Sequence, residues 1–508
     1  MNILSSTYIF SFYTLISRIL GYIRDILIAI FLGTSILADA FFVAFRLPNT
    51  FRRLFAEGTF NAAFIPSYTT EKIKSKKSAK YFADNILSLL IITLSIVVLL
   101  AEIFTPFLVY LIAPGFLQDI DKFDLAVEFT RITFPFLLFV CLSSFFSGIL
   151  NSNNKFAAAA AAPIILNIIL ILSLLISYIF NLDISKNLTI GVSLAGLLQL
   201  IFLVIFTKNF YFPSISFKIK ISPKIKFFLK KLLPSIFSSG VTQINILVGT
   251  IIASFEASAV SYLYYADRVY QINLAIAGMA VGTVSLPVLT KALKSKKLFQ
   301  VEKIQNKALE LCLLLSIPAS LGLILASEEI VNALFGYGSF NEKDIIMTAK
   351  ALIYFGYGIP AFALLKVLSN FFFARDNTKT PFHISIFIVM INIFISLTFF
   401  NQIGFIIIPI ATSISSWLGV LGYIILLKYC KFLMFKKSFY ISFLKILIST
   451  VIMSAILILS LDYFAESLDY LNKFKSIYLI IVVSFAATIY LLLCYLLGIL
   501  NIKKYKII

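Results

Sequence analysis

Charged residues are scarce in this chain of 508 residues, because only 13% are Asp, Glu, Lys or Arg. Soluble domains carry about 25% of these residues, so a soluble enzyme or a nucleic-acid-binding domain is excluded as the main interpretation. Negative charge is the scarcer sign, with 23 acidic residues against 43 basic ones. So few carboxylates leave little material for a metal centre or an acid–base active site.

Histidine and cysteine are also scarce. The single histidine, His383, cannot form a histidine metal site or a catalytic triad by itself. The four cysteines have no metal-binding spacing and most lie in apolar runs, so we interpret them as packing residues: Cys141, Cys312, Cys430 and Cys494. We therefore expect no bound metal and no cofactor.

Apolar residues are what the chain has in excess. They make up 60% of the sequence, including 53 Phe, and the mean hydropathy is +1.00. Since a membrane-spanning helix needs roughly 20 apolar residues, the composition predicts an all-α integral membrane protein with about 14 spans. These spans are expected to begin near Thr7, Ser35, Ala83, Ala126, Ala158, Leu188, Phe227, Ser258, Ala308, Ile345, Phe382, Phe405, Ile441 and Ile477.

The basic residues predict the topology. With the amino terminus in the cytoplasm, the cytoplasmic segments hold 29 Lys and Arg and the outer loops hold 5. Because cytoplasmic loops are enriched in Lys and Arg, both termini are expected in the cytoplasm. Cationic loops facing anionic lipid also explain the net charge of +20, so membrane lipids are expected partners and nucleic acid is not.

The chain repeats itself at an offset of about 220 residues. The run Lys74-Ser75-Lys76-Lys77 returns as Lys294-Ser295-Lys296-Lys297, and Leu166-Asn167-Ile168 returns as Ile391-Asn392-Ile393. A unit of six spans keeps its orientation, so two six-helix lobes related by a pseudo-two-fold axis are expected. We predict an amino-terminal lobe over 1–217, a carboxy-terminal lobe over 218–435, and two further helices over 436–508.

Arginine is the informative cation, because only 8 of the 43 basic residues are Arg. Arg18 and Arg268 lie about ten residues into their predicted spans, where a charge costs roughly 2.5–3.5 kcal/mol. Arg18, Gly21 and Arg24 step by three along one helical face. Each arginine could instead be a snorkelling or salt-bridged residue, although adjacent acids such as Asp25 and Asp267 point in different directions from Arg24 and Arg268.

The second predicted span carries more charge. Arg53 and Glu57 are four residues apart and could pair, which leaves Arg52 to point elsewhere. We predict that Arg18, Arg24, Arg52 and Arg268 converge in a cationic chamber. Because guanidinium groups bind phosphate bidentately, a diphosphate fits such a chamber. Flexible points are expected at Gly21, Pro48, Gly58 and Gly282.

Several motifs resemble those of the MurJ/MviN lipid II flippase family of the MOP exporter superfamily. The amino-terminal motif is the most specific: Ser17-Arg18-Ile19-Leu20-Gly21-Tyr22-Ile23-Arg24-Asp25. Further matches are Ala38-Asp39-Ala40-Phe41, Phe45-Arg46-Leu47-Pro48-Asn49, Arg52-Arg53-Leu54-Phe55-Ala56-Glu57-Gly58 and Tyr265-Ala266-Asp267-Arg268. The resemblance covers the whole chain.

The resemblance implies the MOP exporter fold and a place in the inner membrane of a bacterial cell. It also implies translocation of undecaprenyl-diphosphate-linked disaccharide peptide, lipid II, from the cytoplasmic to the outer leaflet. It implies that the last two helices form a groove for the lipid tail. It places the substrate-binding arginines at Arg18, Arg24, Arg52 and Arg268. The supporting residues that it and the helical spacing select are Ser17, Asp39, Arg53, Glu57 and Asp267. A monomer is expected, with cell-wall synthesis proteins as further partners.

One departure concerns a sodium site that some members of the family hold with carboxylates. The corresponding spans of this chain offer Gln243, Asn245, Asn392 and Ser396 but no acid, so no sodium site is expected. Two alternatives stay open: an exporter of another polyprenyl-linked oligosaccharide, such as an O-antigen unit, and a membrane-embedded glycosyl- or phosphotransferase. The transferase would need a sizeable loop with acidic metal ligands, and no such loop is found, so we expect no enzymatic activity.

Overall fold

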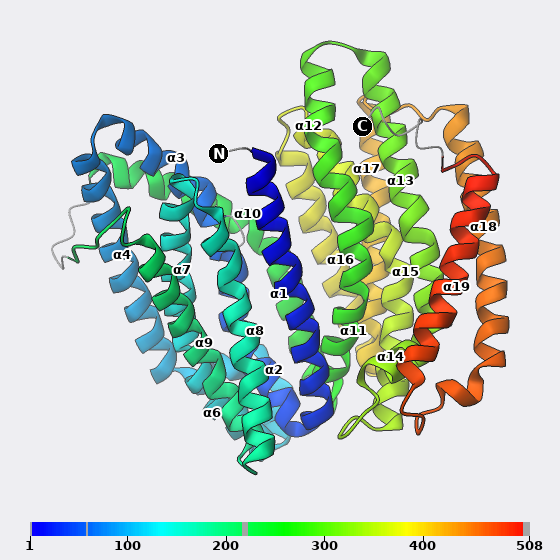
Figure 1. Cartoon of the computed structure of the whole chain (residues 1–508), viewed down its shortest axis with the longest axis horizontal. Coiled ribbons are helices and arrows are strands. Elements are labelled where there is room, and N and C mark those ends of the chain that lie inside the picture. Colours follow the sequence, from blue (N-terminus) through cyan, green and yellow to red (C-terminus); the bar gives the residue numbers. More distant parts are fainter. Residues whose placement is uncertain (1–2, 57–58, 216–221, 501–508) are drawn as a thin grey trace. The chain divides into compact units, whose positions relative to one another are not determined.

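The computed structural model describes residues 3–56, 59–215 and 222–500. These residues form helices joined by short connections, and no strand occurs among them. Two compact units divide the chain, residues 1–261 and 262–508. Each is described by itself below (Figure 1).

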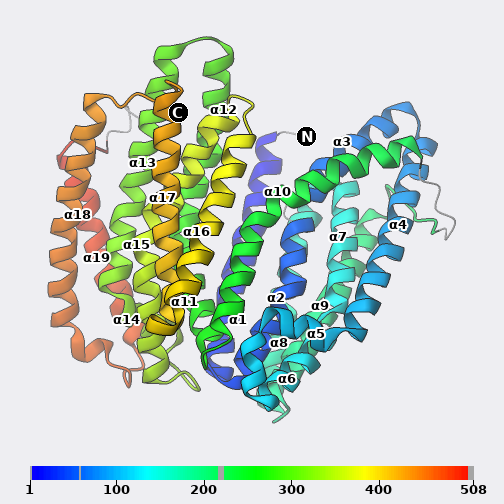
Figure 2. The ribbon, with the colours of Figure 1, turned by 180° about the vertical axis from the view of Figure 1, so that it is seen from behind.

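Unit 1 contains α1 to α10 and the short 3-10 helix η1. Their bounds are α1 Ile3–Leu32, α2 Ile36–Ala56, α3 Thr59–Lys74, α4 Lys76–Ile103, α5 Thr105–Ile112, η1 Pro114–Gln118, α6 Ile120–Thr133, α7 Pro135–Ser152, α8 Phe156–Ile179, α9 Ile184–Thr207 and α10 Pro223–Ala253. α1 packs along α8, and α10 runs past α2 towards α3 and α4 (Figure 2).

Unit 2 contains the remaining helices, and α11 begins at the unit boundary. Their bounds are α11 Ala259–Leu274, the π-helix η2 Ala275–Ala280, α12 Val281–Lys294, α13 Leu298–Leu325, α14 Ser327–Phe335, α15 Glu342–Phe373, α16 Lys379–Ile403, η3 Gly404–Ile406, α17 Ile407–Tyr429, α18 Lys437–Tyr463, η4 Ala465–Leu468 and α19 Lys475–Leu496.

The order of the helices repeats along the chain as the sequence predicts. α1 to α5 correspond in order and length to α10 to α14, and α8 and α9 correspond to α16 and α17. The repeat also contains two short helices that hydropathy did not separate, α3 with α12 and α5 with α14. One difference is local: α6 and α7 are broken at Phe134, where Pro135 starts a new helix, whereas α15 is continuous over 32 residues.

Ten helical stretches among the described residues are long and apolar enough to cross a membrane. One of them, Lys379–Tyr429, contains both α16 and α17. The protein is therefore a multi-pass membrane protein. All fourteen predicted starts fall in or within two residues of a helix, but the number fourteen stays a prediction because α1, α2 and α10 are not among the ten.

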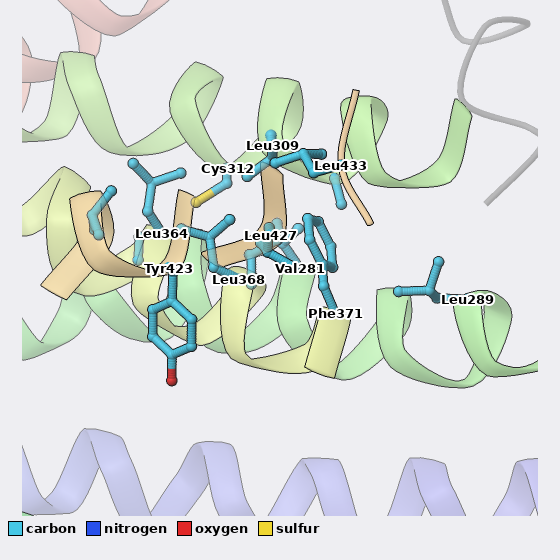
Figure 3. Packing of buried hydrophobic residues seen from close by; sticks show 14 of the residues in the cluster. Val281, Leu289, Leu309, Cys312, Leu364, Leu368, Phe371, Tyr423, Leu427 and Leu433 are labelled. Atoms are coloured by element: carbon cyan, nitrogen blue, oxygen red, sulfur yellow. The ribbon is translucent and has the colours of Figure 1, made fainter. Parts of the chain in front are cut away.

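The core of unit 2 is built from α11 to α17. Figure 3 shows Leu309 and Cys312 of α13 packed with Leu364, Leu368 and Phe371 of α15. A second cluster joins α18 and α19 to α13 and α14. Cys141, Cys312 and Cys494 are buried, as predicted for packing residues, whereas Cys430 is exposed, so the prediction is wrong for Cys430.

α10 contacts α2, α3, α5 and η1, so the first helix of the second repeat packs with unit 1. Compactness alone does not decide which helices move together. The lobe boundaries at 217 and 435 therefore stay predictions.

Candidate functional site

The first part of the site lies on α1, where Ser17, Gly21 and Arg24 face Asn167 of α8. Arg24 is 7% exposed, Ser17 and Gly21 are half-buried, and Arg18 is exposed. A Cβ at Gly21 would meet the Asn167 side chain of α8 at 3.7 Å. Gly21 is thus a point of close helix contact within a continuous α1.

Arg24 forms an ion pair with its neighbour in sequence. Its Nη2 and Nε donate to Asp25 Oδ1 at 2.7 and 3.0 Å, and its Nη1 donates to Asn167 Oδ1 at 2.9 Å. The salt-bridged alternative for Arg24, which the sequence leaves open, is thus confirmed. The long arginine side chain folds back, so its guanidinium reaches a carboxylate that leaves the next backbone position. Arg24 is therefore buried with its charge compensated.

The second part of the site lies on α2. Arg52 is half-buried, and its Nε donates to Asn49 Oδ1 at 2.8 Å, one turn earlier. Pro48 lies inside α2, as predicted, between Asp39 near the start of the helix and Arg52 near its end. Glu57 and Gly58 lie outside the described residues, so the pairing of Arg53 with Glu57 stays a prediction.

Asp39 lies at the start of α2 and is fully buried, at 0% exposed. Lys122 Nζ of α6 donates to its Oδ2 at 2.6 Å, and the Ser261 backbone N–H of α11 donates to its Oδ1 at 2.9 Å. The Ser261 hydroxyl donates to the same oxygen. Lys122 is itself buried and lies 4.2 Å from the Phe116 ring centroid. We call Asp39, Lys122 and Ser261 the Asp39 network.

Two further bonds join the same end of unit 1 to the residues between α10 and α11. Ser258 Oγ donates to Thr34 O at 2.6 Å, and the Gly115 N–H donates to Ser254 Oγ at 3.0 Å. A Cβ at Gly115 would lie 2.3 Å from Ser254 O, a distance that no side chain tolerates. The approach of η1 to the end of α10 therefore requires glycine at this position.

The opposite end of unit 1 is rich in lysine, and we call it the lysine-rich end, defined by residues 71–80 and 224–230. There Glu71 accepts from Lys224 of α10 at 2.6 Å, from Lys74 at 2.8 Å and from Ser78. Burial raises the pKa of the Glu71 carboxyl, but the hydrogen bonds from Lys224, Lys74 and Ser78 outweigh it and lower the pKa to about 2. Phe228 packs against α3 and α4 beside this cluster.

Unit 2 contributes Arg268 on α11. Its Nη2 donates to the Tyr264 hydroxyl at 3.0 Å, and the guanidinium carbon lies 4.7 Å from the Tyr264 ring centroid. Asp267 accepts instead from Gln271, one turn further along the helix. Arg268 and Asp267 therefore have separate partners in unit 2.

A π-helical turn, η2, separates α11 from α12. It places Gly278 so that a Cβ there would lie 3.0 Å from the Ala363 backbone, and Gly282 O accepts from Asn370 Nδ2 at 2.7 Å. Single π-turns inside α-helices are frequent at functional sites. Gly282, predicted as a flexible point, lies directly after this turn.

Arg18 and Arg24 both lie on α1, with Arg24 buried against α8 and Arg18 exposed, whereas Arg52 lies on α2 and Arg268 lies in the other unit. The convergence of all four stays a prediction. Sequence reasoning left Asp25 open as a partner of Arg24. It missed Asn167, which also binds Arg24, and it missed Lys122 and Ser261, which bind Asp39. Asn167 carried one signal, its place in the repeated Leu-Asn-Ile motif. Among the described residues no group of three His, Cys, Asp or Glu could hold a metal ion.

The fold defines the class of protein. An inward-facing transporter of the multidrug resistance MATE family, from the MOP superfamily, matches 80% of this chain and 93% of its own with a TM-score of 0.66. That protein is 15% identical, so it shows the fold alone. The chain has the fold of MOP-superfamily transporters, as predicted.

More specific matches identify the family. The family model for lipid II flippase MurJ matches residues 28–501. A probable lipid II flippase MurJ of Rickettsia prowazekii is 40% identical over 504 residues, covering 97% of this chain and 98% of the relative. A solved lipid II flippase MurJ in an inward closed conformation is 30% identical, with a TM-score of 0.81 over 96% of this chain and 98% of its own. The chain belongs to the lipid II flippase MurJ family.

Proposed function

We propose that this protein moves lipid II, the undecaprenyl-diphosphate-linked precursor of peptidoglycan, from the cytoplasmic to the outer leaflet of the inner membrane. The observation that carries the proposal is the match to lipid II flippases over nearly the whole chain, at up to 40% identity. The transport is a change of leaflet, so no bond of the lipid is made or broken and no enzymatic activity is required.

The arginines supply the recognition chemistry. We assign the diphosphate to Arg18, Arg24, Arg52 and Arg268, because a guanidinium offers a planar pair of donors that matches a phosphate edge. Arg18 is exposed and Arg24 is buried beside Asp25. This difference supports a sequence in which Arg18 meets the diphosphate first and Arg24 binds it after the headgroup enters.

The Asp39 network supports alternating access. It joins α2 and α6 to the first residues of α11, and Gly115 with Ser254 joins η1 to the end of α10. We assign this end to the outer side and the lysine-rich end to the cytoplasm, because Lys and Arg collect in cytoplasmic loops. Release of lipid II to the outer leaflet then requires that Asp39 exchange Ser261 for water while it keeps Lys122.

Depletion with complementation tests the function. A bacterium depleted of its own flippase and expressing this chain should deliver lipid II to the outer leaflet, where an outside label detects it. Arg18→Ala and Arg268→Ala should insert normally and fail to deliver lipid II. Normal membrane expression without delivery by the unaltered chain would overturn the assignment, and normal delivery by Arg268→Ala would overturn the role of that arginine.

A further inference from the structure

Two asparagines occupy equivalent places in the two repeats, in Leu166-Asn167-Ile168 and Ile391-Asn392-Ile393. Both are buried to the same extent, at 6% exposed. We infer that Asn167 is a positioning residue, which holds the Arg24 guanidinium in the orientation that binds the substrate's diphosphate. The inference rests on the proposed function, and it adds a residue of α8 to the recognition site on α1.

Both the oxygen and the nitrogen of the Asn167 amide form hydrogen bonds with residues of α1. Its Oδ1 accepts from Arg24 Nη1 at 2.9 Å, while its Nδ2 donates to Ser17 O at 2.8 Å and lies 3.4 Å from Ser17 Oγ. Between these contacts, the absent side chain of Gly21 lets the amide lie against the helix. A side-chain amide suits this place because its acceptor oxygen and its donor nitrogen are separate atoms. Asn167 therefore fixes two turns of α1, from Ser17 to Arg24, on α8.

The bonds of Arg24 show what this orientation achieves. A guanidinium has five N–H donors, and the bonds to Asp25 and Asn167 use three of them. The two remaining donors are on the terminal nitrogens, which can face a phosphate edge. Asp25 binds the Nε and Nη2 side of the guanidinium, and Asn167 binds Nη1. Removing Asn167 would leave the group to rotate about its Asp25 contact, and binding would then have to order it again.

The second repeat shows that this role is not a general property of the motif. Asn392 of α16 donates to Thr412 Oγ1 of α17 at 3.0 Å and accepts from Ser396 Oγ at 3.1 Å. Its contacts are therefore with neutral hydroxyl groups, in a helix pair inside unit 2. Asn392 thus provides a matched control, with the same residue type, burial and repeat position but without a contact to a cation.

The test measures binding of undecaprenyl diphosphate to the purified full-length protein, with undecaprenyl phosphate as a second probe and an apparent melting temperature for each variant. We expect Asn167→Leu to weaken diphosphate binding tenfold or more and monophosphate binding less. Asn392→Leu should stay within twofold of the wild type for both lipids. Unchanged diphosphate affinity in Asn167→Leu, or an equal loss in Asn392→Leu, would overturn the inference.

A double variant shows whether Asn167 acts through Arg24. If it does, Asn167→Leu combined with Arg24→Ala should bind no more than twofold more weakly than Arg24→Ala alone. Additive losses would contradict the positioning role and leave the proposed function intact. If Arg24→Ala itself binds diphosphate normally, the assignment of Arg24 in the proposed function fails as well, so the two failures are distinguishable.

Asn167→Asp covers the case in which the leucine variant does not accumulate. The aspartate keeps an acceptor for Arg24, and it adds a second negative charge beside a guanidinium already paired with Asp25. We expect this variant to bind diphosphate at least tenfold more weakly, because the added carboxylate competes with the phosphate. Wild-type affinity in Asn167→Asp would refute the inference.

Discussion

Lys122→Met tests the Asp39 network, since it removes one partner of a buried ion pair and keeps the apolar part of the side chain. The Lys122 and Asp39 side chains are 7% and 1% exposed, and their charged atoms are 2.6 Å apart. Removing one partner of such a pair costs about 3–5 kcal/mol, because the other charge stays buried without compensation. Asp39 keeps two bonds from Ser261, which places the expected cost near the lower limit.

A loss of about 3 kcal/mol in a unit of this size corresponds to about 6–12 °C, at about 2–4 °C per kcal/mol. Thermal unfolding of the detergent-solubilised protein, followed by the loss of its monodisperse chromatographic peak, measures this shift. Lys186→Met is the matched control, because Lys186 and Glu128 form a pair at 2.9 Å with side chains 52% and 48% exposed. Exposed pairs contribute about 0–1 kcal/mol.

Asp39→Asn combined with Lys122→Met removes both charges. The double variant should recover at least half of the stability that Lys122→Met loses, because no unpaired charge remains buried. A melting temperature for Lys122→Met no lower than that of Lys186→Met would refute the reasoning. So would a double variant less stable than Lys122→Met.

Three further predictions concern other parts of unit 1. Gly115→Ala should lower the melting temperature, because its Cβ would lie 2.3 Å from a backbone oxygen. Gly322→Ala is the control, because a Cβ there has nothing within 4 Å, and it should raise stability by about 0.5–1 kcal/mol. Equal changes in the melting temperatures of the two variants would contradict this prediction. Because the folded pKa of Glu71 is about 2, below the usual 4.5, its stabilisation is complete above pH 4.5 and is lost as the pH falls towards 2. Glu71→Gln should therefore lower the melting temperature equally at pH 8 and pH 6, and a loss that disappears at either pH would count against the ion pairs. Arg52→Lys should reduce lipid II delivery more than Arg53→Lys, because lysine has no Nε–H for the bond to Asn49; the reverse order in the outside-label assay would refute it.

Hydropathy and motif spacing predicted the helical membrane fold, the repeat and the arginines of α1. The spans are a local property, because each depends on residues within about one helix length, and the repeat is visible because short motifs return at a nearly constant offset. The short helices α3 and α12 escaped the same reasoning. Each is too short to span a membrane, since α3 has 16 residues and α12 has 14, and a hydropathy window merges them with their neighbours.

The partners of the charged residues could not be predicted from spacing. Asn167 is 143 positions from Arg24, and Lys122 is 83 positions from Asp39. Such contacts depend on how whole helices pack, which no local pattern specifies. The Arg24–Asp25 pair stayed an open alternative in the sequence for a different reason. The residues are adjacent, and only the conformation of a long flexible side chain decides whether they meet.

The separation of the Asp39 partners has a consequence for the synthesis of the protein. Ser261 follows Asp39 by 222 residues, and Lys122 follows it by 83. At about 5–20 residues per second, ribosomes make Lys122 about 4–17 s after Asp39 and Ser261 about 11–44 s after it. During that interval Asp39 already lies in the second predicted span of the nascent chain. Lys122 is the first partner available to it, so loss of Lys122 should impair membrane insertion of the nascent chain before it affects transport.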